Sequence, residues 1–261
     1  MKKRVISAIV ALAIVIPLIL LGSWPYKMGV SAVALLAFKE ILDLPKSHGK
    51  YPNMMIAIAT ILLVVLILSN CEASIYDFIS YQVFGVSMLL LLLPTLFYNK
   101  DTYSTKDAFY LLGIVYFLGL VFNLFIVFRM RNINLFIFLL IIPMLNDIFA
   151  YLIGSRFGKN KLCPLISPNK TWEGSIGGFL IGSIGGTLIY HLLVGSISIK
   201  IVVFVMLLSV AGQMGDLVLS LIKRENGIKD FSNIMPGHGG ILDRLDSIIF
   251  VFLTYIVLLG F

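Results

Sequence analysis

Long runs of apolar residues, separated by short polar turns, follow one another along the whole chain. A helix that crosses a bilayer needs about 20 mostly apolar residues. The candidate segments cover residues 5–22, 27–44, 54–69, 79–98, 108–128, 133–153, 175–193, 199–222 and 243–260. The pattern predicts an all-α polytopic integral membrane protein with about nine transmembrane helices. The polar connections are brief except for Gly154–Gly174 and Lys223–Leu242, and long connections of this kind are usually functional.

The overall composition leads to the same class of protein. Of the 261 residues, 59% are hydrophobic and 13% charged, with a mean hydropathy of +1.02. A soluble domain has about a quarter charged residues, so part of this surface must face lipid. The apolar run from Val5 to Gly22 is long for a signal peptide, and no small-x-small cleavage site follows it. We therefore expect a retained first span.

Lysine and arginine gather in alternate connections, which predicts the orientation. With a cytoplasmic N-terminus, only Lys27, Arg129, Arg131 and Lys200 fall outside. The basic residues of the inside segments are Lys2, Lys3, Arg4, Lys46, Lys50, Lys100, Lys106, Arg156, Lys159, Lys161, Lys170, Lys223, Arg224, Lys229 and Arg244. Both long connections then face the cytoplasm, in a multi-pass protein of the cell inner (cytoplasmic) membrane. Topology explains the net charge of +7, so no nucleic-acid partner is expected.

The first half of the chain offers little chemistry. We expect residues 1–140 to form a scaffold with a lipid groove, and residues 141–261 to form the catalytic part. Lys39 and Glu40 lie near the cytoplasmic end of the second predicted span, where snorkelling to the interface explains both. Cys71 and Cys163 fall in connections on opposite sides of the membrane, so no disulfide is expected.

Carboxylates within spans are costly and are candidate sites by default. Asp147 lies deep in the sixth predicted span and Asp216 near the cytoplasmic end of the eighth. Asp243 and Asp246 open the ninth, three residues apart and hence on one helical face. Such acids supply the hard oxygen ligands that suit Mg²⁺. An isolated acid could instead be an ion pair or an interfacial cap.

Both long connections have features that suit phosphate. Pro236–Gly240 brings three glycines next to the acid pair, and glycines let a backbone approach an anion closely. His238 is either a phosphate donor or a polar loop residue. The stretch Ser167–Gly174 offers hydroxyls, an amide and Lys170, while Trp172 is either a base-stacking ring or a membrane anchor. There is no Walker A motif, since Gly154–Lys159 is too short and follows a helix.

Together these motifs resemble a known family. One stretch of the chain resembles the signature of phosphatidate cytidylyltransferases, also called CDP-diacylglycerol synthases. It consists of Ser220–Arg224, then Lys229-Asp230, then Pro236–Asp246. Met235 is a conservative departure. The upstream stretches Asp147–Tyr151 and Ser167–Gly174 are similar to the family as well, so the specific similarity covers about residues 146–247.

The resemblance implies that CTP and phosphatidic acid give CDP-diacylglycerol and pyrophosphate, in phospholipid biosynthesis. It also implies dependence on Mg²⁺, a second metal ion, and a homodimer. The catalytic residues would be Lys223, Arg224, Asp243, Arg244 and Asp246. The substrate-binding residues would be Ser167, Pro168, Asn169, Lys170, Thr171, Lys229, His238, Gly239 and Gly240. The metal ligands would be Asp216, Asp243 and Asp246, with Asp147 and Asp230 as further candidates.

Other functions stay open at this point. A CTP-dependent lipid kinase or a CDP-lipid synthase with another lipid substrate would share much of this chemistry. An ion-coupled transporter is disfavoured, because transporters place broken spans in both halves of the chain, whereas these charges crowd one end. The Asp-Gly-x-x-Ala-Arg pattern of CDP-alcohol phosphotransferases is absent from the sequence.

Overall fold

The computed structural model describes residues 2–47, 50–69, 81–235, 237 and 239–259. These residues divide into two compact units. The N-terminal unit comprises Met1–Arg131 and Phe231–Ile241, and the C-terminal unit comprises Asn132–Asp230 and Leu242–Phe261. The chain therefore leaves the C-terminal unit once and returns to it. The predicted functional division at residue 140 stays a prediction.

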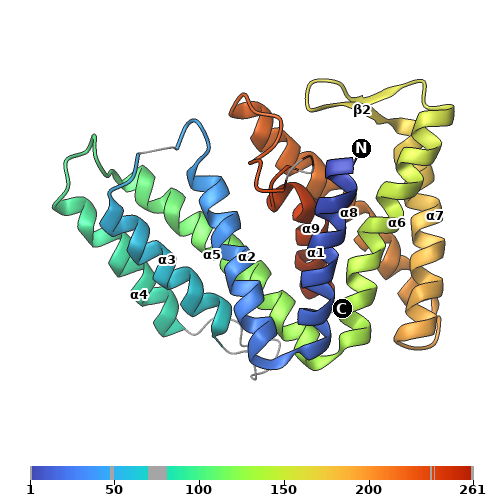
Figure 1. The fold of residues 1–261 in the computed structure, drawn as a ribbon, viewed down its shortest axis with the longest axis horizontal. Coiled ribbons are helices and arrows are strands. Elements are labelled where there is room, and N and C mark those ends of the chain that lie inside the picture. The colour runs from blue at the N-terminus through green and yellow to red at the C-terminus, as the bar shows by residue number, and fades with distance from the viewer. Residues whose placement is uncertain (1, 48–49, 70–80, 236, 238, 260–261) are drawn as a thin grey trace. The chain divides into compact units, whose positions relative to one another are not determined.

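The N-terminal unit is built around its last helix. Its elements are α1 (Lys2–Leu21), α2 (Ser23–Leu42), α3 (Asn53–Leu68), α4 (Tyr81–Leu92), the 3-10 helix η1 (Leu93–Leu96) and α5 (Thr105–Arg131). Helix α5 packs against α2, α3 and α4, as Figure 1 shows. Buried Asn123 donates hydrogen bonds to the carbonyls of Leu66, Ile67 and Ser69. The amide thus satisfies carbonyl groups that the end of α3 leaves without helical partners.

Arg129 is one of the four basic residues that the predicted orientation places outside the cytoplasm, and its contacts explain its position. Its guanidinium donates to the carbonyl of Ile19 at 2.7 Å and to that of Leu20 at 3.0 Å. These carbonyls belong to the last turn of α1, where the helix dipole favours a positive charge. The guanidinium also lies over the ring of Tyr26. Arg129 therefore has a structural role that requires no position on the cytoplasmic side.

The C-terminal unit contains the remaining long helices. They are α6 (Ile133–Phe157), α7 (Trp172–Leu193), α8 (Ile199–Glu225) and α9 (Leu242–Leu258). Gly178, Gly182 and Gly186 recur every four residues in α7 and allow close helix packing. A Cβ atom at Gly182 would collide with the amide oxygen of Asn146 on α6. Asn146 in turn exchanges hydrogen bonds with Ser209 of α8, at 3.0 and 2.9 Å.

Every predicted span overlaps a helix in the described part of the chain, although residues 79–80 lie outside it. Thr105–Arg131, Ile133–Phe157, Trp172–Leu193 and Ile199–Glu225 are long and apolar enough to cross a bilayer. Shorter apolar helices cover Ile9–Leu21, Asn53–Leu68 and Tyr81–Leu96. The chain is a predominantly helical membrane protein.

The first long connection adds two short strands to the predominantly helical fold. Strands β1 (Lys161–Cys163) and β2 (Ser167–Thr171) pair there antiparallel, with Lys161 opposite Thr171 and Cys163 opposite Ser167. The connection is polar and has no helical periodicity, so pairing two short strands satisfies its backbone. Cys163 is a free thiol, and Cys71 lies outside the described residues.

The second long connection is shorter than predicted. Helix α8 continues to Glu225 and α9 begins at Leu242. Lys223 and Arg224 consequently lie in the last turn of α8, and Asp243 lies in the first turn of α9. The acid and the lysine thus stand on helices, whose rigid backbones position side chains better than a loop does.

Candidate active site

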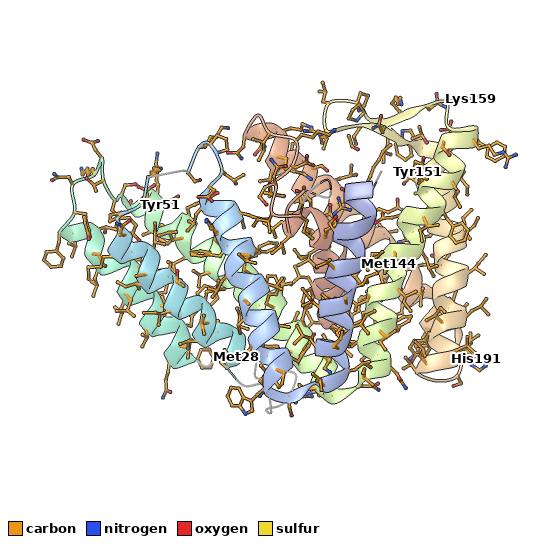
Figure 2. All side chains as sticks on the ribbon, viewed as in Figure 1. Met28, Tyr51, Met144, Tyr151, Lys159 and His191 are labelled. Carbon is orange, nitrogen blue, oxygen red and sulfur yellow. The ribbon has the colours of Figure 1, made fainter. Side chains whose placement is uncertain are left out.

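A cavity of about 570 Å³ lies in the C-terminal unit, within the size range of small-molecule sites. Its walls come from α6, α7, α8 and the β1–β2 connection. Figure 2 shows Tyr151 on α6 and Lys159 toward the same end of the unit, with His191 at the other end. The lining residues are Asp147, Ala150, Tyr151, Gly154, Ser155, Gly158, Lys161, Asn169, Lys170, Thr171, Gly174, Ser175, Gln213 and Asp216.

The cavity contains an ion pair between the two predicted site residues Lys170 and Asp216. Their side chains are 28% and 22% exposed, so both remain accessible to a ligand. Ser220, one helical turn after Asp216, donates a hydrogen bond to the same carboxylate at 3.2 Å. The structure therefore brings together a lysine of strand β2 and an aspartate of α8.

A second ion pair joins α8 to α9. Lys223 Nζ lies 2.6 Å from Asp243 Oδ1, and the two side chains are 9% and 3% exposed. Burying two charges is expensive, and their attraction often only offsets that cost. A pair placed here therefore suggests a use beyond stability. Lys223 and Asp243, both predicted site residues, are therefore in direct contact.

Asp246 lies within the electrostatic reach of Asp147 and Asp216, as well as of Lys223. Asp147 also interacts with Lys170 and Arg244. Acids from α6, α8 and α9 thus interact electrostatically with one another and with Lys170, Lys223 and Arg244. Among the residues that the structure describes, however, no three His, Cys, Asp or Glu side chains form a ready-made metal cluster.

The residues of β2 divide into two groups. Asn169, Lys170 and Thr171 line the cavity, while Ser167 pairs with Cys163 in the hairpin and Pro168 is exposed. Thr171 is buried and caps α7, accepting a hydrogen bond from the Gly174 N–H at 3.2 Å. Its hydroxyl therefore has a structural partner, which is the usual role of threonine at a helix N-cap.

Arg224 holds the β1–β2 hairpin beside the end of α8. Its guanidinium donates to the carbonyl of Ile166 at 3.1 Å and to that of Ile228 at 2.8 Å. Lys229 and Asp230 are exposed on the connection that follows, and Arg244 is exposed on α9. The structure gives Arg224 backbone partners, and its predicted role as a phosphate ligand stays a prediction.

The glycine-containing segment belongs to the N-terminal unit. Gly237 and Gly239 have φ values of 79° and 83°, a backbone region that favours glycine. Gly240 is buried, and a Cβ atom there would collide with the carboxylate of Glu40. His238 lies outside the described residues. The interpretation of Glu40 as an interfacial, snorkelling residue is wrong, because its exposure is only 2%; Lys39 beside it is exposed.

Comparison with known proteins identifies the family of the chain. The profile of the cytidylyltransferase family matches residues 2–261. The chain belongs to this family. Phosphatidate cytidylyltransferases of Staphylococcus haemolyticus and Staphylococcus epidermidis are 34% and 36% identical to it, each over 253 residues and 96% of both chains. The resemblance read from the signature residues is confirmed, and it extends over the apolar N-terminal half as well.

Further polar residues that were not predicted as site residues also line the cavity: Tyr151, Ser155, Lys161, Ser175 and Gln213. Ser175 donates a hydrogen bond to the amide oxygen of Gln213 at 2.5 Å, and Gln213 returns one to the Ser175 carbonyl at 3.1 Å. Gln213 precedes Asp216 by three residues, which puts both on one face of α8. A polar residue at that spacing within an apolar run was the available signal.

Proposed function

We propose that the chain is a CTP:phosphatidate cytidylyltransferase, which transfers CMP from CTP to phosphatidic acid and gives CDP-diacylglycerol and pyrophosphate. The observation that carries this proposal is the presence of two lysine–aspartate ion pairs in the C-terminal unit: Lys170–Asp216, which lines the cavity, and Lys223–Asp243, which joins α8 to α9. Basic groups there can neutralise phosphates, while carboxylates can hold the cation that accompanies a nucleotide. The names of the relatives support the same reaction.

In the proposed reaction, an oxygen of the phosphatidic acid phosphate attacks the α-phosphorus of CTP. The bond between this phosphorus and the oxygen bridging to the β-phosphorus breaks, and pyrophosphate leaves with that bonding pair. The nucleophile is already anionic, so it needs little help from a general base. Catalysis then consists mainly of positioning and charge neutralisation.

The two lysines have the charge and the placement for this task. Lys170 lines the cavity, and a phosphate group can replace Asp216 as the partner of its ammonium. Lys223 is held by Asp243, which fixes the direction of a side chain that would otherwise be flexible. In this proposal Arg244 and Lys229 assist with the outer phosphates, and Gly239 and Gly240 keep their predicted role in substrate binding.

The donor chemistry of the site fits Mg²⁺. This ion is usually held by one or two carboxylates together with substrate phosphates, so it needs no complete protein cluster. Asp216 and Asp246, which interact electrostatically, would hold it. When bound, it would supply charge neutralisation at the phosphate oxygens. Roles for Asp147, Asp230 and Asp243 as metal ligands stay predictions, as does the second metal ion.

The proposal includes the arrangement in the membrane. The nine helical segments would cross the inner membrane with the N-terminus in the cytoplasm, and the active site would face the cytoplasm, where CTP is found. The basic residues of the site support this orientation by the positive-inside rule. The acyl chains would stay in the bilayer. A homodimer, which the family resemblance implies, is part of the same proposal.

Pyrophosphate release from CTP tests the function. The full chain in lipid vesicles is assayed with and without phosphatidic acid, across a titration of Mg²⁺. We expect release that requires both the lipid and the metal ion. Release that is equal without phosphatidic acid, or that occurs only with another lipid phosphate or a lipid alcohol, would contradict the assignment. Ion or solute flux into vesicles without CTP would support the transporter instead.

A further inference from the structure

Glu40 occupies an unusual position for an acidic residue of a membrane helix. It lies in the last turn of α2, yet it is only 2% exposed. Its carboxylate oxygen Oε1 accepts hydrogen bonds from the Ser232 hydroxyl at 2.6 Å and from the Ile241 backbone N–H at 2.7 Å. All of these groups belong to the N-terminal unit. Burying a carboxylate is costly unless hydrogen bonds compensate for the lost water, so this arrangement calls for an explanation.

The two donors stand at opposite ends of the segment Phe231–Ile241. One carboxylate oxygen therefore closes this segment into a loop. Inside the loop, the Met235 N–H donates to the Gly239 carbonyl at 3.0 Å, which forms a second and tighter closure. Gly237 and Gly239 supply the left-handed backbone conformations between these points. Phe231 and Ile241, at the two ends, are 8% exposed, so the loop is anchored at its base.

Gly240 records how closely the carboxylate approaches. A Cβ atom at this position would overlap Glu40 Oε1, and it would lie 2.8 Å from the carboxyl carbon. Glycine at 240 thus makes room for Glu40, an explanation independent of any ligand. The next residue, Ile241, directly precedes α9, on which Asp243 and Asp246 stand. Through its hydrogen bond to Ile241, Glu40 therefore holds the backbone directly before α9.

We propose that Glu40 is a positioning residue for the cytidylyltransfer reaction: by accepting hydrogen bonds from Ser232 and Ile241, it fixes the two ends of the segment that carries Gly239 and Gly240. This inference rests on the proposed function, since the substrate role of Gly239 and Gly240 is part of it. Helix α2 of the otherwise bland N-terminal half thereby contributes to catalysis without touching substrate. A small displacement of a positioned group can lower a rate about 100-fold.

The kinetic test compares Glu40→Ala and Glu40→Gln with a matched control, Asp43→Asn, which alters an exposed acid at the same end of α2. Initial rates of pyrophosphate release are measured against both CTP and phosphatidic acid. We expect Glu40→Ala to lower kcat about 100-fold at a similar KM for phosphatidic acid. Glu40→Gln keeps one acceptor oxygen and should recover about tenfold of that loss. Asp43→Asn should stay within about twofold of the unchanged chain.

Hydrogen exchange provides a readout that requires no activity. Peptides covering residues 231–241 are followed by mass spectrometry in the same samples. Exchange in this segment should rise about tenfold or more in Glu40→Ala and less in Glu40→Gln, and it should be unaltered in Asp43→Asn. If Glu40→Ala does not fold, Ser232→Ala, which removes one of the two donors, replaces it. This variant should show faster exchange and a smaller loss of kcat.

The outcomes separate the two proposals. A wild-type chain that releases no pyrophosphate with phosphatidic acid refutes the proposed function, whatever Glu40 does. An active wild type whose Glu40 variants match Asp43→Asn in kcat overturns the inference. The inference is also overturned if the fall in kcat of Glu40→Ala is fully explained by its fraction of unfolded protein and Glu40→Gln recovers no activity. Faster exchange in residues 231–241 together with lower kcat supports it.

Discussion

Each compact unit contains a buried aspartate paired with a lysine, and the two pairs are built differently. In the N-terminal unit, Asp107 is 4% exposed and lies 2.5 Å from Lys50, whose side chain is 48% exposed. In the C-terminal unit, both Asp243 and Lys223 are buried, at 3% and 9%. One lysine can stay in contact with water, while the other has given up its hydration.

The surroundings show what each pair is for. Asp107 accepts hydrogen bonds from the N–H of Ser104 at 2.9 Å and from its hydroxyl at 2.6 Å. The Ser104 hydroxyl in turn accepts from the Asp107 N–H, which makes a capping box at the start of α5. Local structure explains Asp107 completely. Asp243 instead stands one turn from Asp246, among further acids, where local structure gives no reason for an ion pair.

The largest expected effect is at Asp246. Asp246→Asn should lower kcat/KM for CTP about 1,000-fold, because several kcal/mol of charge stabilisation are lost and each ~1.4 kcal/mol is a factor of ten. Pyrophosphate release in vesicles measures it. Asp101→Asn, at an exposed position of the N-terminal unit, is the matched control and should be unaffected. An Asp246→Asn variant with normal turnover would remove this residue from the site.

The lysines give the next contrast. Lys223→Met leaves a buried carboxylate without its ammonium and should cost about 3–5 kcal/mol of stability; Lys50→Met should cost at most about 1 kcal/mol, since the lysine is half exposed. Thermal unfolding in detergent measures both. The double variant Lys223→Met/Asp243→Leu should regain stability but not turnover. An active double variant would mean that the pair is only structural.

The smallest effect is expected at the capping box. Asp107→Ala should reduce stability by about 1 kcal/mol, in line with other helix caps, and it should leave kcat and KM unaltered. Unfolding and pyrophosphate release are measured on the same preparation. A tenfold loss of kcat in a folded Asp107→Ala protein would show that the two pairs are more alike than their surroundings indicate.

Much of the fold could be predicted from the sequence, because an apolar run of about 20 residues in a bilayer has few alternatives to a helix. Every predicted span overlaps a helix. The β1–β2 hairpin could not be predicted, since strands of three and five residues in a polar connection show no alternation long enough to recognise. The limits of α6 and α8 were too short by about a turn, because polar residues continue these helices beyond the apolar runs.

The site was predicted in part for a similar reason. Carboxylates in apolar spans are conspicuous, so Asp147, Asp216, Asp243 and Asp246 could be singled out one by one. Which lysine pairs with which acid depends on how α8, α9 and β2 pack, and no local pattern contains that information. Glu40 was misread because its partners, Ser232 and Ile241, follow about 190 and 200 residues later.

The return of residues 231–241 to the first unit also bears on how such proteins can be recombined. A chimera that takes its first 131 residues from a relative would keep the aspartates and residues 231–241 of one parent. The rest of the N-terminal unit, in which residues 231–241 lie, would come from the other parent. Exchange would then succeed only where both parents carry an acid that accepts from this segment and a residue without a side chain at 240. The two compact units therefore cannot be exchanged independently, although residues 1–131 are continuous in the sequence.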